Sequence, residues 1–307
     1  MKQFAIGADI GGSHITCQLY DLESRELVEG TRARLAVDSH SSGESIIEVW
    51  TEAIRKSASG YDFNVLAGIG FAMPGPFDYH NGIAWFKGVG KYEALYGIDI
   101  RKEIHERFLV SEDFPVRFLN DASCFAIGES ILGEASEYER FLAVTLGTGF
   151  GTTFILDHLP VAGIYGIPDD GFLYHIPFGD SIADDYFSTR WFQREYSLRL
   201  GKSIEGVKEL AELAGIEGPE REIFRKFGRN LGTFLAPWLK SFEAGCLVAG
   251  GNISTSNVLF AGELDETLLK EGVKVKIIFS SLQEEAALSG SASLCVPDFY
   301  SRLVKDH

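Results

Sequence analysis

The sequence of 307 residues is poor in positive charge. It has 28 Lys and Arg against 44 Asp and Glu, which gives a formal net charge of −16. Nucleic acids and anionic membranes bind basic patches, so we expect neither as a partner. The acidity is typical of a soluble protein, and it does not exclude a phosphate ligand. Backbone N–H groups and a metal ion can hold phosphate on an acidic protein.

Cysteine is also scarce, and its four copies lie far apart among apolar or small residues. This spacing does not match a disulfide framework or a zinc site, both of which need cysteines in pairs or clusters. We therefore predict buried, reduced thiols and no zinc. The four residues are Cys17, Cys124, Cys246 and Cys295.

Long apolar runs are missing as well. No stretch approaches the roughly 20 apolar residues that span a bilayer. The first residues hold one lysine and a short apolar run, a pattern that does not match a signal peptide. We expect a cytoplasmic protein. The hydrophobic share of 45% is enough for a large core, and the length suggests two domains.

The most informative feature is an internal repeat. An apolar strand at 4–8 leads into the glycine turn 9–14 and a second strand at 15–20. The same order returns as a strand at 141–146, the glycine turn 147–152 and a strand at 153–156. The repeat predicts two domains of related plan, each with a glycine-containing hairpin whose backbone can approach a ligand closely.

A third glycine turn at 250–252 follows a short apolar strand. Glycine turns let backbone N–H groups point at phosphate oxygens. Gly147, Gly149 and Gly151 do not match the dinucleotide pattern GxGxxG, and no P-loop lysine pattern is present. A nucleotide would therefore be held by hairpins.

Asn120 and Asp121 stand between a predicted strand at 116–119 and a predicted helix. Ligands in open α/β folds bind at such strand-to-helix turns, yet Asn and Asp most often serve there only as helix caps. The glycine hairpins favour a functional aspartate, and Asn120 can cap while Asp121 faces a ligand. Asp9 could hold Mg²⁺ through water, or stabilise its own turn.

The remaining pattern predicts further strands and helices around these turns. A buried strand at 65–72 ends at the rigid turn 73–76, and 78–97 has no clear period. Ser41 and Glu44 fit a capping box before a helix. The other expected elements are a strand near 32–37, helices at 99–108, 184–200 and 203–214, one or two helices at 219–242 with Pro237 as a kink or break, a strand at 273–279 and a helix at 284–295.

Six segments, in order and spacing, resemble the ROK family (repressors, open reading frames and kinases) from residue 4 to about residue 296. They are ADIGGSHI, GFAMPGPFD, FLNDASCFAIGE, LAVTLGTGFG, CLVAGGNIS and AALSGSASL. The resemblance implies the two-domain α/β fold of actin, Hsp70 chaperones and hexokinases (ribonuclease H-like), with a central cleft. We expect a smaller domain at 1–119 plus 287–307, a larger one at 120–286, and a homodimer.

In the family's sugar kinases ATP binds between the domains and the sugar lies deep in the cleft. The resemblance implies that Asp121 is the general base and that Asn120 contacts a sugar hydroxyl. Gly75 matches the turn that lines the sugar pocket. The residues matching the ATP-phosphate and Mg²⁺ hairpins are Asp9, Gly11, Gly12, Ser13, His14, Gly147, Thr148, Gly149 and Gly151, and those matching the turn near adenosine are Gly250, Gly251 and Asn252.

The sequence departs from the family on the sugar side. The family motif Glu-x-Gly-His, which a zinc-binding cysteine cluster follows, corresponds here to Phe172, Leu173, Tyr174 and His175, with no cysteine cluster. His175 either donates to a sugar hydroxyl or is an ordinary histidine. Asp169 and Asp170 either replace the lost carboxylate or are solvated, and the two aromatic side chains either stack on the sugar or lie in the core.

The first hairpin departs from the family as well. His14 stands where the family often has lysine, which weakens a phosphate contact at neutral pH. Lys87 either points toward the cleft or is simply exposed.

The sequence thus predicts ATP-dependent phosphorylation of a hexose or amino-hexose hydroxyl, with Mg²⁺. Two alternatives stay open. One is a weak or silent sugar-binding or regulatory protein without a DNA-binding domain, because the first hairpin begins at residue 4. The other is a kinase of a non-sugar small molecule, because fold does not determine function.

Overall fold

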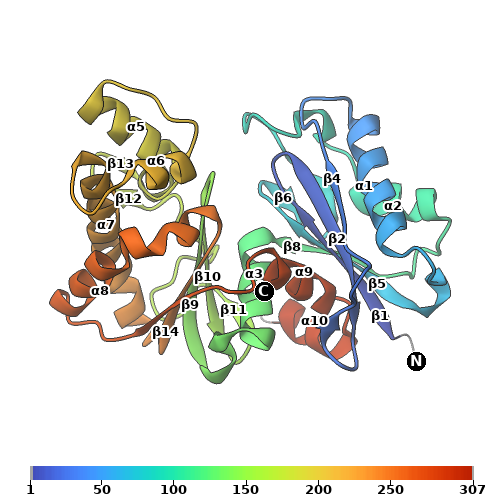
Figure 1. Ribbon diagram of the computed structural model, residues 1–307. Coiled ribbons are helices and arrows are strands. Elements are labelled where there is room, and N and C mark those ends of the chain that lie inside the picture. Colours follow the sequence, from blue (N-terminus) through green and yellow to red (C-terminus); the bar gives the residue numbers. More distant parts are fainter. Residues whose placement is uncertain (1–2, 306–307) are drawn as a thin grey trace. The chain divides into compact units, whose positions relative to one another are not determined.

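The computed structural model describes residues 3–305 and consists of two compact units (Figure 1). One unit comprises the chain up to Ile131 together with the chain from Glu284 onward, and the other is Leu132–Gln283. Each unit is a mixed sheet with helices, so the predicted α/β class is confirmed. The predicted domain boundaries stay a prediction.

The sheet of the first unit has the strand order β3-β2-β1-β5-β8, with β4 also paired to β2. β1 is antiparallel to β2 and parallel to β5, and β5 is parallel to β8. The carboxyl ends of β1, β5 and β8 therefore meet at one edge. The strands are β1 (Phe4–Ile10), β2 (His14–Asp21), β3 (Glu26–Leu27), β4 (Ala33–Ala36), β5 (Leu66–Met73) and β8 (Val116–Asn120).

Alternation along β1 separates its two faces. Ile6, Ala8 and Ile10 belong to the apolar core that includes Trp50 of α1 (Gly43–Ser57). Gly7 lies on the opposite face, where a Cβ would stand 2.1 Å from the carbonyl oxygen of Leu288 in α9 (Glu284–Ser293). Asp9 follows two residues later and therefore shares the α9 face.

The small residues of α9 are explained by close backbone packing. A Cβ on Gly290 would lie 1.9 Å from the carbonyl oxygen of Cys124 in α3 (Asp121–Leu132), and one on Gly128 would lie 1.9 Å from that of Ala286. Gly70 of β5 approaches Ser291 in the same way. These contacts pack α3 and α9 together within the first unit. The last helix is α10 (Pro297–Lys305), which Pro297 begins.

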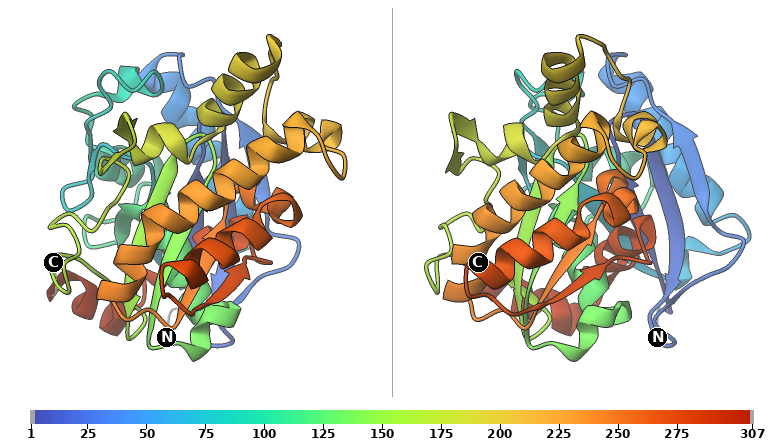
Figure 2. Two further views of the ribbon diagram at one scale, coloured as in Figure 1. Left: turned by 90° about the vertical axis from the view of Figure 1, so that its left-hand side faces the viewer. Right: turned by 60° about the vertical axis from the view of Figure 1, so that its left-hand side comes forward.

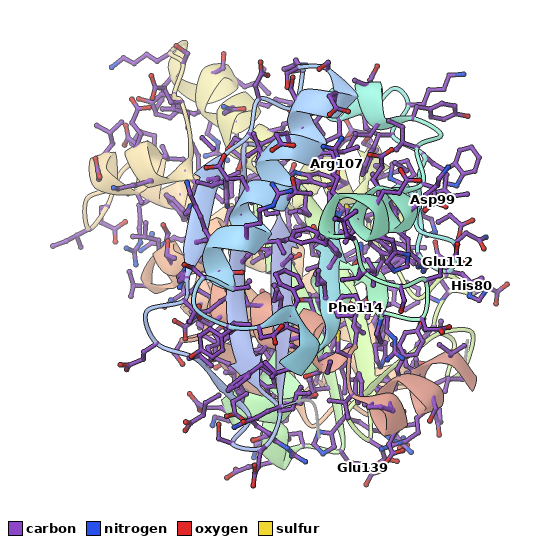
Figure 3. All side chains as sticks on the ribbon, turned by 90° about the vertical axis from the view of Figure 1, so that its right-hand side faces the viewer. His80, Asp99, Arg107, Glu112, Phe114 and Glu139 are labelled. Atoms are coloured by element: carbon purple, nitrogen blue, oxygen red, sulfur yellow. The ribbon has the colours of Figure 1, made fainter. Side chains whose placement is uncertain are left out.

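The two helices α1 and α2 (Ile100–Phe108) cover the same face of the first sheet. α2 is capped by Asp99, and Arg107 near its other end pairs with Glu44 and Glu48 of α1 (Figure 3). The predicted capping box at Ser41 is wrong. Ser42 is the N-cap of α1 and accepts from the backbone N–H of Ser45, because the helix begins at Gly43.

The second unit repeats the plan of the first, which confirms the internal repeat. Its strand order is β11-β10-β9-β14-β15, in which β9 is antiparallel to β10 and parallel to β14, and β14 is parallel to β15. The strands are β9 (Arg140–Leu146), β10 (Phe150–Leu156), β11 (Leu159–Val161), β14 (Cys246–Gly250) and β15 (Lys276–Phe279).

Five α-helices complete the described part of this unit. α7 and α8 pack side by side (Figure 2), and α7 continues through Pro237 as one helix. The single helix predicted for 184–200 is wrong, because the chain breaks at Phe187 and Ser188. The helices are α4 (Ala183–Tyr186), α5 (Thr189–Leu200), α6 (Val207–Leu213), α7 (Pro219–Ser241) and α8 (Ala261–Lys270).

The short hairpins lie where the sequence shows no period. They are β6 (Phe77–Asp78) with β7 (Ile83–Ala84), and β12 (Pro177–Phe178) with β13 (Ser181–Ile182). The four cysteines are buried, as predicted, and none of them forms a disulfide within residues 3–305. Among residues 3–305, no helix combines the length and the apolar character needed to cross a bilayer.

Candidate active site

The first glycine hairpin joins β1 to β2 by a tight turn. The Gly11 N–H donates to the His14 carbonyl oxygen at 2.9 Å, and Gly12 and Ser13 are exposed at the tip. A Cβ on Gly11 would lie 2.8 Å from the His14 ring, so a larger residue there would displace that ring. Asp9 was expected in the turn, but it lies within β1, directly opposite Thr16, because the ladder extends to Ile10.

Asp9 lies among other carboxyl groups near the sheet edge. Burial raises the pKa of Asp9 to about 8, and the negative charges of Asp121 and Glu284 add to this. Asp121 begins α3 and Glu284 begins α9, so two helix N-termini bring their carboxylates near Asp9. The charges of Arg34 and Arg32 act in the opposite direction. A divalent cation beside Asp9 would stabilise the ionised form of this buried carboxyl group.

Asn120 caps α3. Its Oδ1 accepts from the N–H groups of Ala122 at 3.0 Å and Ser123 at 3.2 Å. Its Nδ2 donates to Asp121 Oδ1 at 3.0 Å and to the Tyr79 hydroxyl at 3.3 Å. Asn120 therefore fixes both the start of the helix and the orientation of the neighbouring carboxylate.

Asp121 is partly exposed at the start of α3. Burial raises its pKa, while the Ala122 N–H, the charge of Lys91 and the Asn120 amide act in the opposite direction. A carboxylate with a raised pKa binds a proton more strongly than an ordinary one, which suits a general base.

Gly75 lies beside this pair. A Cβ on Gly75 would be 3.5 Å from the hydroxyl of Tyr79, which donates to the Met73 carbonyl oxygen at 3.2 Å and accepts from Asn120. The first unit thus brings together Gly75, Asn120 and Tyr79. Tyr79 was missed by sequence reasoning, because it lies in the segment without a regular period.

Lys91 was missed as well. It is half-buried, and its δ-carbon lies 3.9 Å from where a Cβ on Gly12 would stand. The next residue, Tyr92, is buried and donates to the Gly11 carbonyl oxygen at 2.6 Å. Lys87, the lysine singled out from the sequence, is exposed, with its Nζ 5.7 Å from the centre of the Tyr96 ring.

His14 is held by Glu284, which is 270 positions away in the sequence. The imidazole Nε2 lies 3.3 Å from Glu284 Oε1. The same carboxylate accepts from Thr16 at 2.9 Å, from Arg34 at 3.0 Å and from Arg32. Burial alone would raise the pKa of Glu284, but these hydrogen bonds and the charge of Arg34 lower it to about 2.

Glu284→Gln is expected to lower the free energy of unfolding at pH 7 by about 3 kcal/mol, the linkage value of a carboxyl whose pKa falls from 4.5 to about 2. The native pKa is lowered, so the contribution is complete above pH 4.5 and is lost as the pH falls toward 2. Urea titrations at several pH values should show the difference between wild type and variant shrinking below about pH 4.5.

Glu285→Gln is the matched control for this series. Glu285 is half exposed, and its ion pair within residues 3–305 is with Arg32, at 3.5 Å. Its removal should cost less than about 0.5 kcal/mol. A loss in Glu284→Gln that does not change with pH would contradict the assigned ion-pair cluster.

In the second unit, the glycine turn between β9 and β10 is open on one side, and on the other side neighbouring helices hold it by hydrogen bonds. The Gly147 N–H donates to the Gly149 carbonyl oxygen at 3.0 Å, and a Cβ on Gly147 would meet nothing within 4 Å. Thr148 and Gly149 are exposed, and Gly151 lies inside β10. The open side of this turn could admit phosphate oxygens to its N–H groups.

The start of α5 and α4 supply these hydrogen bonds. The Thr189 N–H donates to the Gly147 carbonyl oxygen at 2.8 Å, and Arg190 donates to that of Thr148 at 3.1 Å. Asp184 pairs with Arg190 and accepts from the Phe150 N–H at 2.7 Å. These three residues hold the turn in one conformation.

The turn at 250–252 lies beside the end of β9. Gly250 pairs with Thr145 of β9, and Gly251 has φ +83°, with a Cβ position 2.5 Å from the Leu146 carbonyl oxygen. Only glycine fits that position. Asn252 is exposed at the start of a short 3₁₀ helix, Asn252–Leu259. The second unit therefore gathers two of the three predicted glycine turns at one edge.

His175 belongs to an exposed segment of the second unit. Its Nδ1 lies 3.6 Å from Asp170 Oδ2, and its ring packs edge-on against Tyr174 with the centres 5.1 Å apart. The Asp184 N–H donates to the Tyr174 carbonyl oxygen at 2.9 Å, which links this segment to the second glycine turn. Tyr174 is 47% exposed, so it is available for a ligand and is no core residue.

No group of three or more His, Cys, Asp or Glu that could hold a metal ion by itself is found among residues 3–305. The donor set around Asp9 consists of single carboxylates, which suits Mg²⁺ that keeps most of its water and binds phosphate.

Comparison with known proteins identifies relatives over nearly the whole chain. The model of the ROK family matches residues 5–297. The N-acetyl-D-glucosamine kinase of Pectobacterium carotovorum subsp. carotovorum is 23% identical over 273 residues, which cover 83% of this chain and 85% of that protein. The glucokinase of Thermotoga maritima is 23% identical over 316 residues, covering 94% and 96% of the two chains.

A solved structure shows a similar fold. It is the crystal structure of a ROK family glucokinase from Streptomyces griseus in complex with glucose and AMPPNP. The TM-score is 0.76 at 21% identity, and the match covers 95% of this chain and 98% of that one.

Proposed function

This chain belongs to the ROK family, and from that membership we propose that it transfers the γ-phosphoryl group of ATP to a hydroxyl of a hexose or an amino-hexose. The actin-like two-domain fold expected from the sequence is confirmed by the similarity to the Streptomyces griseus structure. The curated relatives are sugar kinases for glucose or N-acetylglucosamine, which supports this substrate class.

The observation that carries the proposal is the arrangement of Asp121. Its carboxylate is fixed by Asn120, has a raised pKa and interacts electrostatically with Asp9 near the first glycine hairpin. A general base for phosphoryl transfer needs this combination of orientation, partial burial and nearby phosphate groups. Asp121 would accept the proton of the attacking hydroxyl.

The residues present fit ATP and Mg²⁺. The open Cβ position of Gly147 and the exposed tip at Gly12 and Ser13 leave space for a phosphate group to approach the backbone of these turns. Burial raises the pKa of Asp9, and a cation would stabilise its ionised form, so Asp9 would hold Mg²⁺ through its water. When bound, the metal ion neutralises negative charge on the phosphates.

The phosphate-binding and adenosine-binding roles expected from the sequence are part of this proposal. The phosphate and Mg²⁺ set expected from the sequence is Asp9, Gly11, Gly12, Ser13, His14, Gly147, Thr148, Gly149 and Gly151, and the adenosine set is Gly250, Gly251 and Asn252. Of these, His14 faces Glu284, so the proposal gives the phosphate contacts of the first hairpin to its backbone N–H groups.

Each unit, taken by itself, offers polar side chains that suit sugar hydroxyls. In the first unit, Asn120 and the turn at Gly75 are joined through Tyr79, which places an amide and a hydroxyl for sugar hydroxyls. In the second unit, His175 is exposed and can donate to a hydroxyl, with Tyr174 beside it as a stacking surface. Phe172 stands where the family has a glutamate on the sugar side. This loss favours a catalytically weak or silent sugar-binding protein as the second candidate function.

The test is ADP release measured over a panel of acceptors with Mg²⁺ and ATP. The panel contains glucose, mannose, N-acetylglucosamine and N-acetylmannosamine, with glycerol and small hydroxy acids as non-sugar acceptors. We expect one or more hexoses to stimulate ADP release at least tenfold over the acceptor-free rate. Stimulation by the non-sugar acceptors alone would show that the substrate is not a sugar. If no acceptor stimulates ADP release, a catalytically silent binding protein would be favoured.

The homodimer and the cytoplasmic location stay predictions. The absence of zinc also stays a prediction, and elemental analysis of the purified protein would test it, since a stoichiometric zinc content would contradict it.

A further inference from the structure

We propose that Lys91 binds the phosphoryl group undergoing transfer and supplies the side-chain cation that the first glycine hairpin lacks. This inference rests on the proposed kinase function and adds a residue that no sequence motif indicates. It follows from three features of the first unit: the partners of His14, the placement of Lys91 and the anchoring of its loop.

The basic side chain of the hairpin itself is engaged elsewhere. His14 is the first residue of β2, and its ring faces Glu284. The Glu284 carboxylate also accepts hydrogen bonds from Thr16, Arg32 and Arg34. The arginines lie on or next to β4, and Arg34 pairs with Thr16 across the ladder. All of these side chains converge on one carboxylate, so they form a neutralised structural cluster. None of these basic side chains, all within residues 3–305, is left free at the hairpin tip.

Lys91 lies beside the tip of the hairpin. Its aliphatic stem runs beside Gly12, with the δ-carbon 3.9 Å from the Cβ position of that glycine. The side chain is half-buried, and within the described residues 3–305 it has no hydrogen bond or ion pair. A partly buried lysine with no direct hydrogen bond or ion pair is uncommon, because burial of the charge costs free energy that such a contact normally offsets.

The loop around Lys91 is anchored firmly. Tyr92 has φ 58°, is fully buried, and donates through its hydroxyl to Gly11 and through its N–H to the Ser39 carbonyl oxygen at 2.8 Å. Its ring packs against Trp50 at 5.6 Å and Phe86 at 5.8 Å. The Gly90 N–H donates to Glu93 at 3.1 Å. Through Tyr92, the backbone of Lys91 is therefore anchored to the glycine hairpin. This anchoring fixes the position of the aliphatic stem of Lys91.

The charge of Lys91 acts where phosphoryl transfer would occur. It favours the ionised form of Asp121, the proposed base, so the ammonium group is within electrostatic range of that carboxylate. Its stem contacts the hairpin proposed to bind phosphate. A cation between the base and the phosphate turn would bind a γ-phosphoryl oxygen and stabilise the charge that develops on it.

The reaction is balanced with Lys91 as a binding group only. The acceptor oxygen forms a bond to the γ-phosphorus while the bond from that phosphorus to the β,γ-bridging oxygen breaks. ADP leaves with the electron pair of the broken bond, and the hydroxyl proton passes to Asp121. Lys91 keeps its proton throughout.

The test compares Lys91→Met and Lys91→Arg with wild type. For Lys91→Met we expect kcat with the best acceptor to fall about 10²- to 10³-fold, with the KM of the acceptor unchanged within about threefold. Affinity for AMPPNP, measured calorimetrically with Mg²⁺, should fall about tenfold, while affinity for ADP should stay the same. Lys91→Arg should retain a substantial part of kcat, because it retains the charge.

The pH profile gives an independent readout. Removal of the cation raises the pKa of Asp121, so the acid limb of kcat/KM should move to higher pH in Lys91→Met and not in Lys91→Arg. Lys87→Met is the matched control, because Lys87 lies four residues earlier in the same segment and is exposed. It should behave as wild type.

The outcomes separate two failures. If wild type shows no acceptor-stimulated ADP release, the proposed function fails, and AMPPNP binding alone then decides whether Lys91 contacts the γ-phosphate. If wild type is active and Lys91→Met keeps both its kcat and its AMPPNP affinity, the Lys91 assignment is wrong. A change confined to the KM of the acceptor would also overturn it, since that result would assign Lys91 to acceptor binding.

Discussion

Asp121→Asn is expected to reduce kcat for sugar phosphorylation by about 10²- to 10⁴-fold, the usual contribution of a general base. The amide keeps the size of the side chain and its hydrogen bond from the Ala122 N–H, so the fold around α3 should persist. It cannot accept the hydroxyl proton. KM for the sugar and affinity for AMPPNP should change only a few-fold, because the lost interaction develops in the transition state.

The pH dependence should change in the same variant. In wild type the rate should rise with pH as Asp121 ionises, at a pKa above its ordinary value because the group is buried. The residual rate of Asp121→Asn should not show this limb. Steady-state kinetics between pH 5 and 9 measure both effects.

Asp99→Asn is the matched control for helix capping. Asp99 caps α2 by accepting from the Lys102 N–H at 3.0 Å, and it lies at the start of that helix (Figure 3). Asn is an equally good cap, so this variant should keep both stability and activity. An Asp121→Asn variant that retains wild-type kcat would return Asp121 to the role of a residue at the start of a helix, without catalytic function.

Gly290→Ala should destabilise the protein by roughly 3–5 kcal/mol, at the upper end of overpacking effects. The added methyl group would stand 1.9 Å from the carbonyl oxygen of Cys124 and 3.0 Å from the backbone N of Gly128. These are backbone atoms of α3, which cannot rotate away as a side chain can. α3 and α9 would have to separate, and both carry carboxylates of the site at their N-termini.

The measurement is thermal unfolding followed by circular dichroism. A loss of this size should lower Tm by about 10 °C, given the usual 2–4 °C per kcal/mol for chains somewhat shorter than this one. Gly262→Ala in α8 is the matched control. Nothing lies within 4 Å of its Cβ position, so alanine should be neutral or slightly stabilising there. Equal Tm values for the two variants would contradict the close packing of α3 and α9.

Local patterns in the sequence predicted much of this protein. Apolar runs and glycine turns predicted the hairpins at Asp9–His14 and Gly147–Gly151, and their repetition predicted two sheets of one plan, which the strand orders confirm. The helix after Asn120 was predicted from spacing. Errors arose at ends and breaks, such as Ser41 for Ser42, where side chains of similar capping ability are adjacent.

The roles of individual polar side chains were decided by the tertiary structure. The sequence alone predicts that Asp121 stands at the start of a helix, that Asn120 can cap this helix, and that the glycine turns can approach phosphate. These features depend on hydrogen bonds within a few residues. It does not indicate that Glu284 holds His14, or that Lys91 accompanies Gly12 while Lys87 is exposed. Those contacts depend on the return of α9 to the first unit and on the burial of Tyr92, and such long-range packing leaves no periodic signal in the sequence.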